Sequence, residues 1–224
     1  GNPELKQEFN HSFNISFNRN KIIALNEGQP SLSSTVTYLS QFGQPLYLHK
    51  VGEPIGMMIG YVWEGNYQYP DFDNPAPGVY VLKSSVPDNG SGRNTVQPGD
   101  IKLKDINGDG TVNAADLTVI GRGQPIHIGG FSNNLTYKGF NLNLFFQWSY
   151  GNNLYNANRL LLEGNSNGFH GINQYASYAN RWTPENQTNE NYRTRGQGFI
   201  GYFSSKNLED GSYLRLKTVS LSYA

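Results

Sequence analysis

The chain has 224 residues, and its 17 basic and 17 acidic side chains balance to a formal net charge of zero at pH 7. A balanced charge gives no electrostatic reason to expect a nucleic-acid partner, because nucleic acids attract basic surfaces. Cysteine is absent, which excludes disulfide frameworks and thiolate metal sites. Charged residues make up only 15% of the chain and aromatic residues 13%, a composition that favours β-structure with large contact surfaces.

The first predicted strand covers residues 8–18. Aromatic, aliphatic or histidine side chains stand at every second position from Phe9 to Phe17, with Asn or Ser between them. Alternation with a period of two predicts a strand with one apolar and one polar face. We expect a short turn at residues 18–20 and the start of a second strand at residues 21–25.

Between residues 26 and 99, Gly and Pro divide the chain into short pieces. Residues 46–51 and 55–63 are predicted to be extended, and residues 69–78 to form a loop. The candidate ligand-binding residues in this region are Trp63, Tyr67, Tyr69 and Phe72. Aromatic rings line many ligand sites and stack on the faces of sugars. The alternative is that these rings pack within the loop itself.

Residues 105–116 read DINGDGTVNAAD, with oxygen-bearing side chains at loop positions 1, 3, 5, 9 and 12 and glycine at position 6. This spacing is typical of a twelve-residue calcium loop, in which the glycine allows a sharp turn. The predicted calcium ligands are Asp105, Asn107, Asp109, Thr111 (through its carbonyl), Asn113 and Asp116. Position 12 is Asp rather than Glu, so closure around an ion needs a tighter loop. The alternative is an Asx and Gly turn that holds no metal.

The remaining elements are one helical turn expected at residues 117–120 and strands that return from residue 129. Lys138 and Gly139 are predicted to form a tight hairpin turn. The strand at 140–150 is the clearest, because every residue on one of its faces is apolar or aromatic. Residues 151–210 are irregular, with a helix expected within 172–182, and residues 213–223 alternate again.

Three features favour strands that cross a membrane over a soluble β-sandwich, which is the alternative. The strands are about 9–11 residues long, as tilted membrane strands are, whereas soluble strands average about 5–6. Their polar faces carry Asn, Ser and Gln more than Lys and Glu. Tight turns alternate with the long segments 26–128 and 151–210, as in outer-membrane barrels. We predict an all-β fold: an antiparallel transmembrane β-barrel segment with long extracellular loops.

Several phrases spread along the chain are shared with one family. They are FNISFNRNKI at 13–22, VGEPIG at 51–56, GYVWEG at 60–65, PGDIKLKDINGDG at 98–110, LTYKGFNL at 135–142, FFQWSYGN at 145–152, YANRWTPEN at 178–186 and EDGSYLRLKTVSLSY at 209–223. In these phrases and in their order, the chain resembles the SusC/RagA-like TonB-dependent transporters of Bacteroidetes outer membranes.

The resemblance implies that residues 1–224 are part of the barrel domain of a longer protein, an incomplete barrel without the plug domain and the last strands. Barrel strands are then expected near residues 8–25, 129–150 and 211–224. The implied function is import of large nutrients, oligosaccharides or peptides, across the outer membrane. The implied partners are a SusD-like surface lipoprotein, the TonB complex through regions outside this chain, the glycan or peptide cargo, and membrane lipid. Calcium would then be structural and would hold an extracellular loop together.

No catalytic residues are predicted, and the chain is not expected to be an enzyme. Its histidines lack HExxH spacing, and neither a GxSxG motif nor a Walker loop occurs. The alternative function is a soluble, calcium-stabilised β-sheet module that binds carbohydrate or mediates adhesion. The acidic loop also resembles half of a dockerin, but dockerins carry two such loops and this chain has no second copy.

Overall fold

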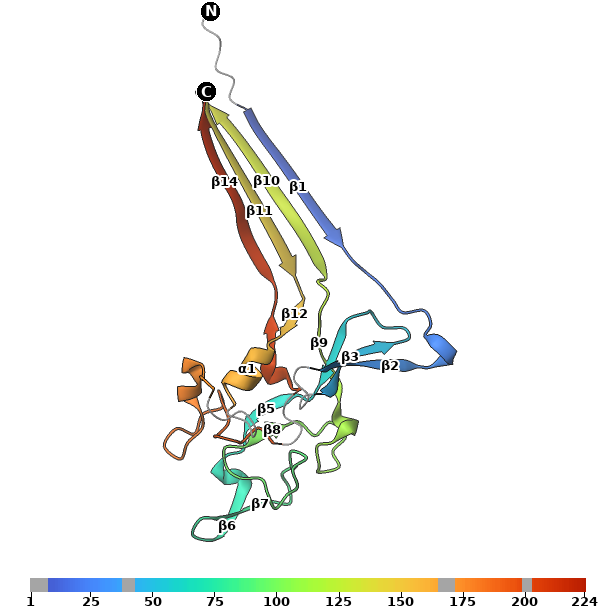
Figure 1. The fold of residues 1–224 in the computed structure, drawn as a ribbon, viewed down its shortest axis with the longest axis vertical. Coiled ribbons are helices and arrows are strands. Elements are labelled where there is room, and N and C mark those ends of the chain that lie inside the picture. The colour runs from blue at the N-terminus through green and yellow to red at the C-terminus, as the bar shows by residue number, and fades with distance from the viewer. Residues whose placement is uncertain (1–7, 38–42, 165–171, 199–202) are drawn as a thin grey trace, which may run out of the picture.

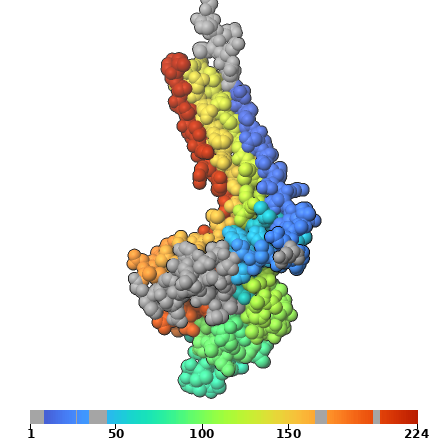
Figure 2. All heavy atoms as spheres, turned by 45° about the vertical axis from the view of Figure 1, so that its right-hand side comes forward, coloured from blue at the N-terminus to red at the C-terminus, as the bar shows by residue number. Residues whose placement is uncertain are grey.

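The computed structural model of the chain describes residues 8–37, 43–164, 172–198 and 203–224. Over these residues the protein has two parts (Figure 1). One is a sheet of four long strands, which we call the long sheet. The other, which we call the base, comprises the described residues of 18–126 and 151–212. Figure 2 shows the long sheet as a narrow slab that projects from the bulkier base.

The long sheet contains β1 (Glu8–Phe17), β10 (His127–Tyr137), β11 (Phe140–Tyr150) and β14 (Tyr213–Tyr223), paired in the order β1-β10-β11-β14. Every pairing is antiparallel. The turn between β10 and β11 has positive φ at Lys138 (46°) and Gly139 (82°). Two positive φ values match the right-handed twist of a hairpin, and glycine adopts them without a steric penalty. The antiparallel all-β prediction is therefore confirmed.

The base holds four smaller sheets, with strand orders β2-β3-β4-β9, β5-β8, β6-β7 and β12-β13 among the described residues. Its strands are β2 (Ser31–Thr37), β3 (Gly43–Lys50), β4 (Met57–Gly60), β5 (Trp63–Asn66), β6 (Phe72–Ala76), β7 (Val79–Leu82), β8 (Ile101–Leu103), β9 (Thr118–Arg122), β12 (Asn153–Tyr155) and β13 (Leu208–Asp210). Its helices are α1 (Ala157–Leu162) and the 3-10 helices η1 (Asn26–Gly28), η2 (Tyr69–Asp71), η3 (Ala114–Asp116), η4 (Ala176–Asn180) and η5 (Ser205–Asn207).

Buried apolar side chains gather in the base. Three clusters are found there: Leu46, Met58, Leu160 and Phe203; Tyr61, Ile101, Leu103, Val112 and Tyr192; and Tyr67, Phe72, Leu82 and Val96. Two of the clusters combine residues from before β10 with residues from after β11. The two long connections of the sheet therefore fold together into one body.

The turn predicted at residues 18–20 and the strand predicted at 21–25 are wrong. The neighbour of β1 in the sheet is β10, which offers an alternating run as long as β1 itself. Residues 18–25 instead run down to the base, where Ile22 donates a backbone hydrogen bond to Glu53 and accepts one from Gly52 (3.0 and 2.9 Å). A five-residue segment cannot match the ladder of hydrogen bonds that a ten-residue strand forms with β10.

The helical turn predicted at residues 117–120 is also wrong, because this segment belongs to β9. Thr118, Val119 and Ile120 are β-branched, which suits a strand, and Val119 pairs with Ile59 of β4. The helical turn lies just before it, in η3. The loop predicted at 69–78 contains η2 and most of the β6-β7 hairpin, and the helix expected within 172–182 is the short η4. The extended segments at 46–51 and 55–63 are confirmed by β3, β4 and the start of β5.

Within the described ranges, no helix has the length and apolar character needed to cross a membrane.

Candidate functional site

One face of the long sheet is apolar and exposed. The register places on it Phe9, Phe13, Ile15, Phe17, Phe131, Leu135, Tyr137, Phe140, Leu142, Leu144, Phe146, Trp148, Tyr150, Leu214, Leu216, Val219, Leu221 and Tyr223, with His11, His127, Gly129 and Asn133 among them. Phe13 is 64% exposed and Leu221 67% exposed. These rings contact one another along the surface, for example Phe13 with Trp148 at 5.5 Å between ring centroids. We call this surface the apolar face.

The opposite surface, the polar face, carries mainly Asn, Ser, Thr and Gln. Its members include Asn10, Ser12, Asn14, Ser16, Ser132, Asn134, Thr136, Asn141, Asn143, Gln147, Ser149, Thr218, Ser220 and Ser222. Neighbouring strands exchange side-chain hydrogen bonds here, as between Thr136 and Asn141 (2.7 Å). The polar face also holds a hollow of about 220 Å³ that Asn14, Gln147 and Lys217 help to line.

The long sheet is therefore amphipathic, with one face suited to an apolar medium and the other to water. Soluble monomers rarely expose a contiguous apolar surface larger than a few hundred Å². In membrane barrels, by contrast, strands alternate between side chains that face lipid and side chains that face the lumen. The arrangement in the long sheet has that alternation on all four strands.

The acidic loop at 105–116 is held together by its carboxylates. Asp116 is fully buried, and its carboxylate accepts backbone N–H bonds from Ile106, Asn107 and Asn113 (2.8, 3.2 and 2.8 Å). Asp105 accepts from the N–H groups of Gly108 and Gly110 (2.7 and 2.8 Å). Together these two carboxylates fold the loop back on itself without needing an added group.

The other predicted calcium ligands take part in the same network. Asp109 accepts from the N–H of Thr111 (2.9 Å), and this bond and the amide of Asn107 lower the pKa of its carboxyl. Asn113 caps η3 by accepting from the N–H of Ala115 (2.9 Å) and donates to the carbonyl of Thr111 (3.0 Å). Among the described residues, no group of three or more His, Cys, Asp or Glu side chains is placed to hold a metal ion. The calcium ligand set therefore stays a prediction.

The structure does not bring the four candidate aromatic residues into one binding surface. Tyr67 is fully buried, donates its hydroxyl to the carbonyl of Pro87 (2.6 Å) and packs with buried Phe72 in one apolar cluster. Burial also raises the pKa of the Tyr67 hydroxyl far above its usual range. Tyr69 is half-buried against Tyr80, and Trp63 packs at the edge of a different cluster. These contacts are those of the loop-packing alternative, and the ligand role stays a prediction.

A buried lysine forms a polar centre in the base that no pattern in the sequence singles out. Lys206 donates to the carbonyl of Glu190 and to the side chain of Asn191 (2.8 and 2.7 Å). Its ammonium lies 5.1 Å from the centre of the Trp63 ring and 3.9 Å from the Glu163 carboxylate. Burial, with the nearby Arg159 charge, lowers the pKa of Lys206 to about 8. Only the tertiary fold brings these partners together.

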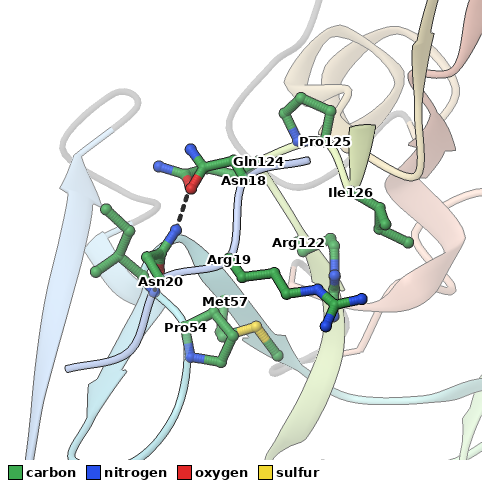
Figure 3. A pocket seen from close by; sticks show the side chains of 10 residues that line it. Asn18, Arg19, Asn20, Pro54, Met57, Arg122, Gln124, Pro125 and Ile126 are labelled. Atoms are coloured by element: carbon green, nitrogen blue, oxygen red, sulfur yellow. Dashed lines mark hydrogen bonds between the residues drawn. The ribbon is translucent and has the colours of Figure 1, made fainter. Parts of the chain in front are cut away.

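A second feature that sequence reasoning missed is a pocket of about 300 Å³ where the long sheet meets the base. Residues from three segments line it: Asn18, Arg19 and Asn20 after β1; Pro54, Ile55 and Met57 around the start of β4; and Arg122, Gln124, Pro125 and Ile126 from the end of β9 onward. Figure 3 shows the Arg19 side chain extending from the segment after β1 towards Arg122. No local motif could reveal it, because each segment contributes only three or four residues.

Comparison with known proteins places these features in a wider group. No protein-family model matches the chain. It is 34% identical over 221 residues to TonB-dependent receptor P3 of Formosa agariphila, an alignment that covers 97% of this chain and 20% of the relative. It is 33% identical over 210 residues to TonB-dependent receptor P26 of the same organism, covering 93% of this chain and 19% of the relative.

Solved structures show the same fold. A chain in the structure of the RagAB peptide transporter matches with a TM-score of 0.68 at 21% identity, over 97% of this chain and 21% of that chain. The RagAB peptide importer in its open-open state gives a TM-score of 0.64 at 22% identity, over 97% of this chain and 20% of that one. The chain thus spans about a fifth of the length of the proteins it matches.

Proposed function

Because the chain is homologous to TonB-dependent receptors over nearly its whole length, we propose that it forms part of the β-barrel of an outer-membrane importer. The proposed cargo is a large nutrient, an oligosaccharide or a peptide, and the energy for import comes through TonB. The observation that carries the proposal is the long sheet, with one continuous apolar face and one polar face. In this role the apolar face contacts lipid and the polar face lines the lumen.

The lengths of the connections orient the sheet. Outer-membrane barrels have short turns on the periplasmic side and long loops on the extracellular side. The hairpin turn at Lys138 and Gly139 is therefore periplasmic in this proposal, and the base is extracellular. A SusD-like lipoprotein would cap the base from outside. The resemblance of the sequence phrases and the shared fold with the RagAB transporter support this partner.

The edges of the long sheet indicate that it works within a larger barrel. Among the described residues, neither β1 nor β14 pairs with another strand on its outer side. Unpaired backbone groups are not tolerated in lipid, so a barrel must close. We propose that strands outside this chain pair with β1 and β14. The chain by itself would have no transport activity, and the proposal assigns it no catalysis.

Calcium has a place in this proposal as a structural ion of the acidic loop. The ligands would be Asp105, Asn107, Asp109, Asn113, Asp116 and the carbonyl of Thr111. The spacing supports this role, as does a hollow of about 530 Å³ that Asp105, Asp109 and Glu64 help to line. Each oxygen of Asp105 accepts a single hydrogen bond from the described residues, which leaves a lone pair on each for an ion. Bound calcium would stiffen a loop that contacts cargo or the lipoprotein.

The experiment that tests the function is expression of the complete reading frame, followed by cell fractionation and uptake assays. We expect the protein in the outer-membrane fraction, in a β-rich form that resists heat in detergent. We expect labelled oligosaccharide or peptide mixtures to enter cells only when TonB is present. A monodisperse, detergent-free monomer with a closed core would contradict the proposal and would favour the soluble β-sheet module.

A further inference from the structure

The pocket between the long sheet and the base contains two positive charges that have no acidic partner among the described residues. Arg19 and Arg122 both line it, and neither forms an ion pair with any Asp or Glu that the structure describes. Glu53, next in sequence to the lining residue Pro54, makes no ion pair with either.

The pocket is partly apolar and open to solvent. Ile55, Met57 and Ile126 contribute apolar surface beside the two guanidinium groups, and Arg19 is exposed. Two like charges that share such a space raise each other's energy, and a bound anion relieves that repulsion. The pocket is thus better suited to an anionic group than to water alone.

A side-chain amide, that of Gln124, adds a hydrogen-bond donor to the two arginines of the pocket. The Asn20 side chain is held in place because its carbonyl oxygen accepts from the backbone N–H of Ile55 (2.8 Å). Its Nδ2 donates a hydrogen bond to Oε1 of Gln124 (2.8 Å), as Figure 3 shows. This bond holds the Gln124 side chain by its amide oxygen. Within the part of the chain that the structure describes, the Nε2 group of Gln124 has no acceptor. Asn20 is therefore a positioning residue, and Gln124 keeps a donor for a ligand.

We propose that Arg19, Arg122 and Gln124 bind a carboxylate group of the imported cargo. The planar guanidinium forks match the two oxygens of a carboxylate, and such charge-assisted bonds are stronger than bonds between neutral groups. The place fits this task, because the pocket lies where the long sheet meets the base, and the base is extracellular in the proposed orientation. This inference rests on the proposed import function and adds that the cargo is acidic, either a sugar acid or an acidic peptide.

Binding to the full-length protein purified in detergent tests the inference. Isothermal titration would use two carboxylate probes, digalacturonate and a blocked Ala-Glu-Ala peptide. Their neutral counterparts are the methyl ester of digalacturonate and blocked Ala-Gln-Ala. We expect at least one carboxylate probe to bind about tenfold more tightly than its counterpart, and high salt to reduce the difference. Whether the sugar or the peptide shows the preference identifies the source of the carboxylate.

The variant Arg19→Gln/Arg122→Gln is expected to lose this preference, whereas Arg181→Gln is expected to keep it. Arg181 is a matched control, because it lies outside the pocket and stacks on the Tyr178 ring. Arg122→Gln alone replaces the double variant if the latter does not assemble. Equal binding of acidic and neutral probes, no binding of either, or a preference that survives in the double variant would each overturn the inference.

Uptake assays separate this inference from the proposed function. The control variant Arg181→Gln is expected to import cargo as the unsubstituted protein does, because Arg181 lies outside the pocket. If the unsubstituted protein binds carboxylates selectively but imports nothing, the proposed function fails and the carboxylate site stands. If import proceeds without selectivity for acidic probes, the proposed function stands and the carboxylate site fails.

Discussion

The long sheet and the base differ in how much of their apolar surface is buried within the chain. In the base, Tyr67, Ile101 and Val112 are almost completely buried in clusters, and even a lysine is enclosed with its partners. In the long sheet, Phe13 and Leu221 remain mostly exposed. The base stabilises itself through its own contacts, whereas in the proposed role the apolar face of the long sheet is covered by lipid.

This difference has a consequence for substitutions. A change in the base acts through packing and hydrogen bonds within the protein. If the apolar face meets lipid as proposed, a change on it acts through the transfer of a side chain from lipid to water or the reverse. Four experiments distinguish these two kinds of effect, from the largest expected change to the smallest.

The largest effect is expected from a charge placed on the apolar face. Leu144→Arg near the middle of β11 should reduce the stability of the assembled protein by about 2–4 kcal/mol, the cost of arginine near the centre of a bilayer. Asn143→Arg, on the adjacent residue of the polar face, should cost far less. Heat-modifiable migration of the outer-membrane fraction on gels measures both. Equal losses in the two variants would mean that the apolar face does not meet lipid.

Calcium is expected to give the next largest effect, and it would act in the base. At a calcium concentration 100 times the dissociation constant, the loop should gain about 2.7 kcal/mol of stability. The melting temperature of the base should therefore rise with calcium and fall with chelator, and Asp105→Ala should abolish the change. Asp73→Ala, at an exposed position on β6, is the matched control. A melting temperature that chelator leaves unchanged would leave the hydrogen-bonded turn as the explanation of the loop.

The buried lysine predicts a dependence on alkaline pH. Burial lowers the pKa of Lys206 to about 8 in the folded protein, against the ordinary lysine value of 10.5. Between these values the unfolded chain binds more protons than the folded one, so the stability of the base should rise with pH, by at most about 1.4 kcal/mol per pH unit. The measurement is the urea midpoint from pH 8 to 9.5, followed by tryptophan fluorescence. This range avoids Tyr67, whose raised pKa lowers stability above about pH 10.

Lys206→Met is the variant that isolates the effect, because it keeps the apolar stem and removes the titrating group. The rise in stability with pH should be absent in this variant. An equal rise in both proteins would assign the pH dependence to other groups.

The smallest effect is expected at Tyr67. Tyr67→Phe removes the hydrogen bond to Pro87 and should cost about 1 kcal/mol, while cargo binding stays unchanged. Tyr47→Phe is the control, since no described residue forms a hydrogen bond with the Tyr47 hydroxyl. If cargo binding weakens and stability does not, the aromatic residues form a ligand surface as well as a core.

Prediction from the sequence succeeded where local pattern and tertiary structure agree. The alternation in residues 9–17 and 140–150 is long enough to define a strand and its two faces, because a period of two requires no partner to be recognised. It failed at residues 21–25 and 117–120, where short runs are compatible with several structures. There the outcome depends on which strand is available as a neighbour, β10 for β1 and β4 for β9.

The candidate site shows the same division. The acidic loop could be found from spacing, because all its side chains lie within twelve residues. The pocket with Arg19 and Arg122, and the polar centre around Lys206, combine residues from distant segments and have no local pattern. Likewise, the aromatic residues 63–72 suggested a surface, and only packing revealed that Tyr67 is enclosed.

The sequence by itself determined the antiparallel β-architecture, the two faces of the long strands and the membership of the chain in a group of outer-membrane receptors. The first two follow from the alternation of side chains along each strand. The third follows from short sequence phrases shared with the family, which can be recognised without knowing which residues are in contact. The tertiary structure decided which strands are neighbours, which charges lack a partner and which polar groups are buried. Those properties depend on contacts between residues far apart in the chain, and local patterns carry no information about such contacts.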